Sequence, residues 1–177
     1  ELVFNVTTNG KTIENYIDTR LHGDLMISLR PSADDWEKSW RKNNESHPMV
    51  NDWNFLGLGI CVYDLESASA YYSHLGYSQS NKIIDRQEWG VSFQEYSISK
   101  ILLELIQAEK DSIYSSSLKQ RGEGVAELIF EVSDLKKEID RLVGKGTEIL
   151  QISDDNKMAS MGSGMKGNIL TRLVQKG

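Results

Sequence analysis

The sequence predicts an α+β protein made of two paired βαβββ units, preceded by a shorter segment of three strands. One observation behind this prediction is an internal repeat. The stretch GLGICVYDLESASAYYSHLGY from Gly57 resembles ELIFEVSDLKKEIDRLVGKGT from Glu127, which begins 70 residues later. A second observation is that ILLELIQ from Ile101 resembles ILTRLVQ from Ile169, 68 residues later. Two segments repeated in the same order at nearly the same period indicate a duplicated structural unit.

Each repeat begins with a strand and a helix. The short apolar run at 56–62 predicts a strand, and Asp64 is a suitable N-cap for a helix over 65–75. In the second copy, the apolar run 126–132 is followed by Asp134 as the corresponding cap. The apolar residues behind this cap lie at i, i+4, i+7 and i+8, on one helical face: Leu135, Ile139, Leu142 and Val143.

Further strands complete each unit. EWGVSFQEYSI (88–98) and ISKILLELIQA (98–108) end the first repeat, while TEILQISDDNKMASM (147–161) and GNILTRLVQ (167–175) end the second. The glycine-rich stretch GSGMKG (162–167) has the composition of a phosphate-binding loop, but the helix that such a loop requires does not follow it. We therefore interpret it as a loop between strands.

The first part of the chain has a different pattern. Three candidate strands, 2–8, 12–18 and 24–31, are separated by turns at Asn9-Gly10 and His22-Gly23. The third, DLMISLRP, resembles ILLELIQ with Ser28 in the place of Glu104. Residues 1–31 are thus predicted to be the βββ end of a further unit whose first strand and helix are absent.

The predicted division is into residues 1–31, a helix and linker over 32–54, and a domain over 55–177, whose repeats cover 55–108 and 124–176. Trp36 and Trp40 lie on one face of the expected linker helix, and with Trp53 they are expected to pack the linker onto the domain or a partner. Unpaired strand edges promote association. We therefore expect a homodimer, or an upstream segment of a longer gene product, to complete the N-terminal unit.

Composition excludes several classes of protein. The net charge of −6 and the pI of about 5.1 disfavour nucleic-acid binding. No run of 18 or more apolar residues is present, so no membrane-spanning helix is expected. A single cysteine, Cys61, excludes an internal disulfide framework and favours a reducing compartment, so the expected location is the cytoplasm. The strand around Cys61 predicts that it is a core residue.

The repeated motifs resemble those of the vicinal oxygen chelate superfamily, which includes glyoxalases, bleomycin-resistance proteins, extradiol dioxygenases and methylmalonyl-CoA epimerases. The family pattern His-x-Gly-Ile-x-Val-x-Asp-Leu is matched at Gly59, Ile60, Val62, Asp64 and Leu65. RGEGVAELIFEVSDL (121–135) is similar to the Arg-Gly-Glu-Gly segment and following strand of the epimerases. The resemblance covers roughly 55–176 and implies a glyoxalase-like fold in which the two units curl into a cup-shaped sheet.

The same resemblance implies four metal-ligand positions in the cup, which fall on Gly57, Glu104, Glu127 and Arg172. In metal-dependent relatives a divalent ion there stabilises an enediolate or enolate as a Lewis acid. Only Glu104 is a usual ligand of the family, Gly57 has no donor, and Arg172 is a permanent cation. We therefore predict no metal cofactor, with a divalent ion as the alternative. His22, His47 and His74 occupy none of these positions.

Two interpretations of the cup remain. Glu104 and Glu127 are the candidate catalytic residues, one of them acting as general base, while Arg172 and Glu131 are the candidate ligand-binding residues. The alternative is that Arg172 only neutralises two carboxylates inherited from a metal-binding ancestor. The function predicted is binding of a small anionic or polar molecule at a degraded metal site. The second hypothesis is a metal-dependent isomerase or lyase of the methylmalonyl-CoA epimerase or lactoylglutathione lyase kind.

Overall fold

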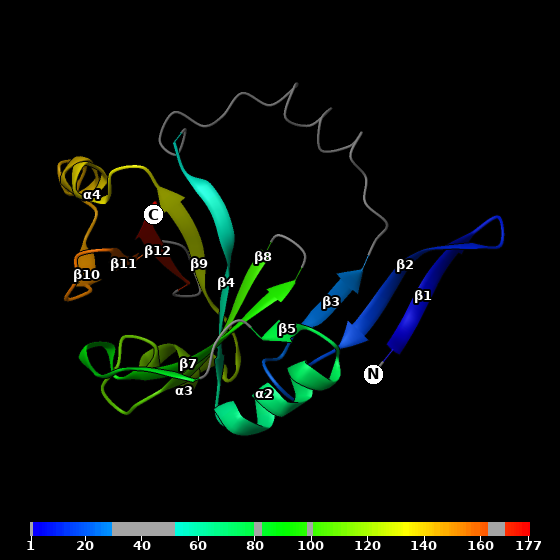
Figure 1. Cartoon of the computed structure of the whole chain (residues 1–177). Coiled ribbons are helices and arrows are strands. Elements are labelled where there is room, and N and C mark those ends of the chain that lie inside the picture. The colour runs from blue at the N-terminus through cyan, green and yellow to red at the C-terminus, as the bar shows by residue number, and fades with distance from the viewer. Residues whose placement is uncertain (1, 30–51, 80–82, 99–100, 163–168) are drawn as a thin grey trace. The chain divides into compact units, whose positions relative to one another are not determined.

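The structure is a computed structural model that describes residues 2–29, 52–79, 83–98, 101–162 and 169–177 (Figure 1). The chain divides into two compact units, Glu1–Asn51 and Asp52–Gly177. The predicted linker helix with Trp36 and Trp40, His47 and most of the 162–167 loop lie outside the described residues. No helix in the described part of the chain is both long enough and apolar enough to cross a membrane.

The N-terminal unit contains one antiparallel sheet in the order β1-β2-β3, as the strand pattern predicts. Its strands are β1 (Leu2–Thr8), β2 (Lys11–Asp18) and β3 (Met26–Leu29). Thr8 pairs with Lys11, so the loop is the two-residue turn Asn9-Gly10, and both residues have positive φ angles of 52° and 74°. Such a turn favours Asn-Gly because few other residues adopt this backbone conformation.

The C-terminal unit is built on a nine-stranded mixed sheet. Its order is β10-β11-β12-β9-β4-β8-β7-β5, and β6 pairs with β7. The first repeat contributes β4 (Asn54–Val62), α2 (Leu65–His74), β5 (Ser78–Gln79), β6 (Ile84–Arg86), the 3₁₀ turn η1 (Gln87–Trp89), β7 (Val91–Ile98) and β8 (Ile101–Ala108). The second contributes β9 (Gly124–Val132), α4 (Leu135–Val143), β10 (Ile149–Ile152), β11 (Met158–Gly162) and β12 (Leu170–Gln175), and α3 (Ser115–Arg121) connects the two.

The two repeats are equivalent in topology and register. In each, the last strand pairs in parallel with the first, β8 with β4 and β12 with β9. Gly57 faces Leu102 in the first repeat, and the equivalent Glu127 faces Leu170 in the second. The repeats meet where β4 and β9 pair antiparallel. This arrangement confirms the predicted fold class and the paired βαβββ units.

Residues shared by the two repeats explain how each helix begins. The carboxylates of Asp64 and Asp134 each accept a hydrogen bond from the backbone N–H three residues on, at 3.0 and 2.9 Å. The equivalent glutamines Gln107 and Gln175 lie at the C-terminal ends of β8 and β12. Their side-chain carbonyls accept from the N–H groups of Leu65 and Leu135 at 2.8 and 2.7 Å. Each helix start is therefore fixed to its own sheet.

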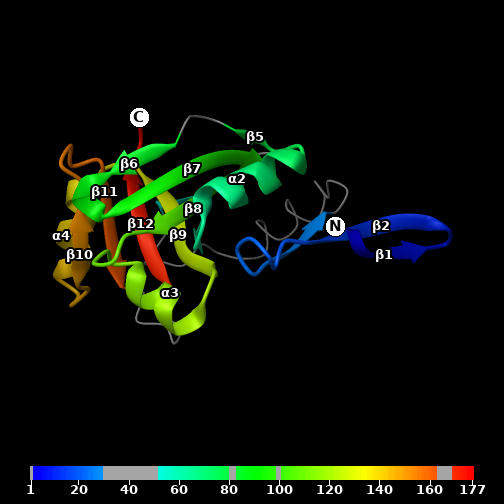
Figure 2. The same cartoon turned by 90° about the horizontal axis from the view of Figure 1, so that it is seen from below.

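Helices α2 and α4 cover the outer face of the sheet (Figures 1 and 2). Apolar residues of α4 pack with alternate residues of β11 and β12, in a cluster formed by Val132, Leu135, Leu142, Ala159, Met161 and Leu173. Because side chains alternate along a strand, the residues between these ones face the inner side. The inner face carries a second cluster: Cys61, Trp89, Val91, Phe93, Ile106, Tyr114, Ala126, Met158 and Leu170.

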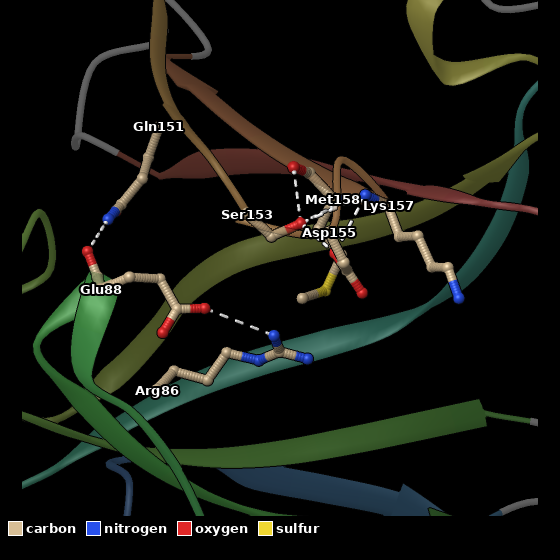
Figure 3. A network of polar contacts seen from close by, with 7 residues as sticks. All are labelled: Arg86, Glu88, Gln151, Ser153, Asp155, Lys157 and Met158. Carbon is tan, nitrogen blue, oxygen red and sulfur yellow. Dashed lines mark hydrogen bonds and ion pairs between the residues drawn. The ribbon is translucent and has the colours of Figure 1, made fainter.

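The two ends of the sheet meet at the mouth of the cup. The side-chain amide of Gln151, on β10, donates to the backbone oxygen of Glu88, in η1, at 2.5 Å (Figure 3). The carboxylate of Glu88 also pairs with Arg86 at 3.4 Å. Since β10 lies at one end of the strand order and η1 follows β6 at the other, this contact joins the two ends of the curled sheet.

Candidate functional site

Strand register brings the candidate residues together on the inner face. Gly59 on β4 lies opposite Glu104 on β8 and opposite Glu127 on β9, so the two carboxylates flank one glycine. Arg172 on β12 lies opposite Ile129, two residues further along β9. Three strands that are far apart in sequence therefore present Glu104, Glu127 and Arg172 to one place, as the alternation of the strands predicts.

Arg172 lies between the two carboxylates. Its Nη2 forms an ion pair with Glu127 Oε1 at 2.9 Å and a hydrogen-bonded ion pair with Glu104 Oε2. On the other side, the Tyr114 hydroxyl donates to Glu127 Oε2 at 2.8 Å. We call these four residues the ion cluster. The exposed fractions of Arg172, Glu104, Glu127 and Tyr114 are 3%, 4%, 0% and 1%, so the cluster is almost entirely removed from solvent.

Burial and charge act in opposite directions on the protonation of the cluster. Burial raises the pKa of Glu127 from 4.5 to about 7, against the lowering effect of Arg172, and the charge of Glu104 adds to the rise. Burial would lower the pKa of Arg172, but the two carboxylates outweigh it and hold that pKa above its usual range. The pKa of Tyr114 is well above its usual value because of burial and the neighbouring Glu127. Tyr114 is therefore a hydrogen-bond donor at neutral pH.

The two glycines of β4 have different roles. A Cβ atom on Gly59 would lie 2.5 Å from Glu127 Oε1, so this glycine makes the space that the Glu127 side chain occupies. A Cβ atom on Gly57, the first expected ligand position, would lie 1.8 Å from the backbone oxygen of Leu102. A register irregularity between Phe55 and Gly57 accompanies this close approach. Restoring a ligand side chain at Gly57 therefore requires the backbone to move.

The donor set does not fit a divalent metal ion. Arg172 Nη2 occupies the place between Glu104 and Glu127 where an ion bound by both carboxylates would lie. A guanidinium group has no lone pair to donate and carries the same sign of charge as the metal. Within the described residues, no group of three or more His, Cys, Asp or Glu side chains is arranged to hold a metal ion.

Glu131 lies on the same face of β9 as Glu127 but four residues further along, which is about 13 Å at the rise of a strand. It is half-buried near the end of the strand. The structure therefore places Glu131 at the rim of the cup rather than in the ion cluster. The role in ligand binding that the sequence analysis assigns to Glu131 stays a prediction.

Sequence reasoning missed two residues of the site. Tyr114 lies in the connection between the repeats, just before α3, a helix that was not predicted. Trp89 belongs to η1, and its ring centroid lies 6.0 Å from Cζ of Arg172, within the range of a cation–π interaction. Neither residue belongs to the repeat pattern, so no sequence pattern marks either one as part of the site. Cys61 lies in the inner cluster as predicted, and burial, with the charge of Glu127, raises the pKa of its thiol to about 12.

Solved structures with the same fold include methylmalonyl-CoA epimerases. The epimerase of Mycobacterium tuberculosis has 22% sequence identity and a TM-score of 0.61, with 77% of this chain and 95% of that chain covered. A Streptomyces coelicolor epimerase variant in complex with 2-nitronate-propionyl-CoA has 20% identity and a TM-score of 0.60, covering 70% and 96%. A hypothetical protein from Bacillus halodurans has 17% identity and a TM-score of 0.60, covering 71% and 95%. At this level of identity these likenesses show the fold.

Family membership rests on the sequence itself. A search among curated proteins found no significant match. The profile of the glyoxalase/bleomycin resistance protein/dioxygenase superfamily, however, matches residues 58–161, which is more than half of the chain. The matched region contains the second half of β4, all of β9, the helices α2 and α4, and both carboxylates of the ion cluster. The chain belongs to the glyoxalase/bleomycin resistance protein/dioxygenase superfamily.

Proposed function

We propose that the domain over 55–177 binds a small polar or anionic molecule in its cup without a metal ion. The observation that carries this proposal is the position of the Arg172 guanidinium between Glu104 and Glu127. It supplies a permanent positive charge where metal-dependent members of the family hold a divalent ion. The carboxylates are thereby balanced by the chain itself.

The ion cluster also has unused hydrogen-bonding capacity. Among the described residues, Nε of Arg172 is buried and has no hydrogen-bond partner. A buried donor without a partner is costly, and an acceptor oxygen on a ligand removes that cost. A carboxylate, carbonyl or hydroxyl group of a small molecule supplies such an oxygen. In this proposal Arg172 binds the ligand, and Glu131 contacts it at the rim.

Binding without a metal is tested by thermal unfolding in the presence of ligand candidates. We expect a small carboxylate or an acyl-CoA thioester to raise the melting temperature equally with and without EDTA. The matched variant is Arg172→Lys, which keeps the charge but loses the planar fork, and we expect it to abolish that rise. A rise that occurs only with added metal, or that persists unchanged in Arg172→Lys, would overturn the proposal.

A second candidate function is proton transfer at a carbon next to a carbonyl group, as in an epimerase or another isomerase or lyase. The pKa of about 7 for Glu127 favours this candidate, because a general base works best when its pKa lies near the operating pH. Arg172 would then stabilise the negative charge that develops on the carbonyl oxygen. The structural likeness to methylmalonyl-CoA epimerases adds support at the level of fold.

The two functions are distinguished by hydrogen exchange. If the domain is an epimerase, methylmalonyl-CoA incubated with it in D₂O incorporates deuterium at the α-carbon, and Glu127→Gln abolishes the incorporation. If it is a binding module, no deuterium is incorporated above the uncatalysed rate even when the thioester stabilises the protein. We further propose a cytoplasmic location, because the single cysteine is buried and no internal disulfide can form.

A further inference from the structure

A pocket of about 450 Å³ opens at the mouth of the cup, outside the ion cluster. Three segments form it: η1, the connection from β8 to α3, and β10. Trp89 lines this pocket and also lies beside Arg172. The same indole therefore borders both the pocket and the buried ion cluster. The pocket has walls from both repeats, which meet there through the contact between Gln151 and Glu88 (Figure 3).

Three polar atoms that have no hydrogen-bond partner among the described residues belong to side chains that line this pocket. They are Nε1 of Trp89, Oγ of Ser112 and Oε1 of Gln151. Trp89 and Ser112 are only 3% and 8% exposed. Leaving such groups unpaired costs free energy, so unpaired groups in native structures call for a physical explanation. Their gathering around one pocket indicates a ligand that pairs with them.

The three atoms define what that ligand must offer. The indole N–H of Trp89 is a donor only, and the Ser112 hydroxyl donates or accepts, so a carbonyl oxygen suits both. The free oxygen of the Gln151 side chain is an acceptor, so it requires an N–H or O–H group. All three atoms are buried, and the amide nitrogen of the same Gln151 side chain is held by its hydrogen bond to the Glu88 oxygen.

The charge at the rim favours a cation. Glu109 and Asp111 are exposed carboxylates on the β8–α3 connection, opposed there by Lys110, while the carboxylate of Glu88 is already paired with Arg86. The connection is held in place because the N–H of Glu109 donates to the Gly90 oxygen at 2.8 Å. An ammonium group at the rim is attracted electrostatically by both carboxylates, whereas a carboxylate ligand is repelled by them.

We propose that this pocket, which we call the mouth pocket, binds a small organic amine that carries a neighbouring carbonyl or amide group. Its ammonium group lies at Glu109 and Asp111, its carbonyl oxygen accepts from Trp89 and Ser112, and its N–H donates to Gln151. This second site is distinct from the ion cluster, which is lined by other residues apart from the shared contact with Trp89. This proposal goes beyond the proposed function, because ligand binding at the mouth pocket does not require that a ligand also binds at Arg172.

The test uses glycinamide, the smallest probe with an ammonium, a carbonyl and an amide N–H, and follows the Trp89 indole N–H signal by NMR. The signal is assigned by its loss in Trp89→Phe. We expect a saturable shift with glycinamide, no saturable shift with acetate, and roughly fivefold weaker binding in the Glu109→Gln, Asp111→Asn double variant. The matched control is Glu66→Gln, which removes an exposed carboxylate on α2 and should leave the affinity unchanged.

Three results would each overturn the proposal. The first is a Trp89 signal that does not shift saturably with glycinamide in the intact chain. The second is equal binding of glycinamide and acetate, and the third is equal weakening of glycinamide binding by Glu66→Gln and by the double variant. Both carboxylates at the rim are exposed, so the double variant is expected to fold normally, and its indole spectrum without probe serves as the check. These outcomes do not depend on whether a ligand binds at Arg172 without a metal ion, so the two proposals can fail separately.

Discussion

Arg172 determines the character of the inner face more than any other residue. It is almost fully buried and pairs with two carboxylates that come from different repeats. At the equivalent position in the first repeat stands Glu104, so the duplicated units have opposite charges at one site. The ion pair between Arg172 and Glu104 therefore joins equivalent positions of the two repeats. This explains how two acidic residues remain buried without a metal ligand set.

The first prediction concerns removal of that charge. Arg172→Met leaves Glu104 and Glu127 buried without a counter-ion, and we expect the free energy of unfolding of the domain to fall by about 3–5 kcal/mol. Urea unfolding followed by tryptophan fluorescence measures the change. The matched control is Lys136→Met, which removes a cation from the exposed pair with Asp140 and should leave the unfolding midpoint nearly unchanged. Equal effects of the two substitutions would show that Arg172 is not needed to balance the cluster.

The second prediction concerns pH. The folded state raises the pKa of Glu127 from 4.5 to about 7, so it favours the protonated carboxyl. The stability that this protonation contributes is fully present below about pH 4.5 and is lost as the pH rises through about 7. Glu127→Gln cannot titrate. Relative to the parent chain, this variant should therefore gain stability as the pH is raised from 5 to 8, by roughly 1 kcal/mol or more.

Thermal unfolding at several pH values, comparing the parent with Glu127→Gln, measures this difference. Glu131→Gln is the control, because that residue lies on the same strand face but at the rim. A stability difference between parent and Glu127→Gln that does not vary with pH would mean that Glu127 is ionised throughout this range.

At the level of elements, most of the fold could be predicted from the sequence, because the signals are local and occur twice. The repeat sets the strand order, and Asp64 and Asp134 mark where the helices begin. The site was predictable only in part. Glu104, Glu127 and Arg172 follow from strand alternation, whereas Tyr114 and Trp89 come from a connection and a turn with no periodic pattern. Their approach depends on how far the sheet curls, which local sequence does not specify.

The third prediction belongs to this scale. Gln107 and Gln175 perform the same task in the two repeats, since each accepts from the first N–H of the helix in its own unit. Gln107→Ala and Gln175→Ala should therefore each destabilise the domain by about 1–2 kcal/mol, and by similar amounts. Urea unfolding of the two single variants and of the double variant measures this. A large loss in only one of them would contradict the equivalence of the repeats.

At the level of the whole molecule, the N-terminal sheet resembles an incomplete unit. In both complete units the edge of the last strand is covered in parallel by the first strand, β8 by β4 and β12 by β9. Strand β3, which matches β8 in sequence, is the edge of its sheet within the described residues. We propose that a second copy of the chain covers this edge, in a homodimer.

The fourth prediction is the corresponding mass in solution. Light scattering coupled to gel filtration should give about 40 kDa for the full chain, twice the 20.0 kDa of one copy. Residues 52–177 form a compact unit with clusters of their own, so that segment alone is the control and should be monomeric. A full chain that is monomeric, with residues 1–30 in fast exchange with solvent, would refute the proposal.

The central claim is that the Arg172 guanidinium takes the place of the metal ion in this cup. The most direct test is elemental analysis of the purified chain after incubation with an excess of nickel, cobalt, zinc, manganese and iron(II), followed by desalting. Because the guanidinium lies between the two carboxylates that would coordinate an ion, we predict far less than one metal per chain and an unchanged melting temperature. A near-stoichiometric content of any of these metals, lost in the Glu104→Gln, Glu127→Gln double variant, would contradict it.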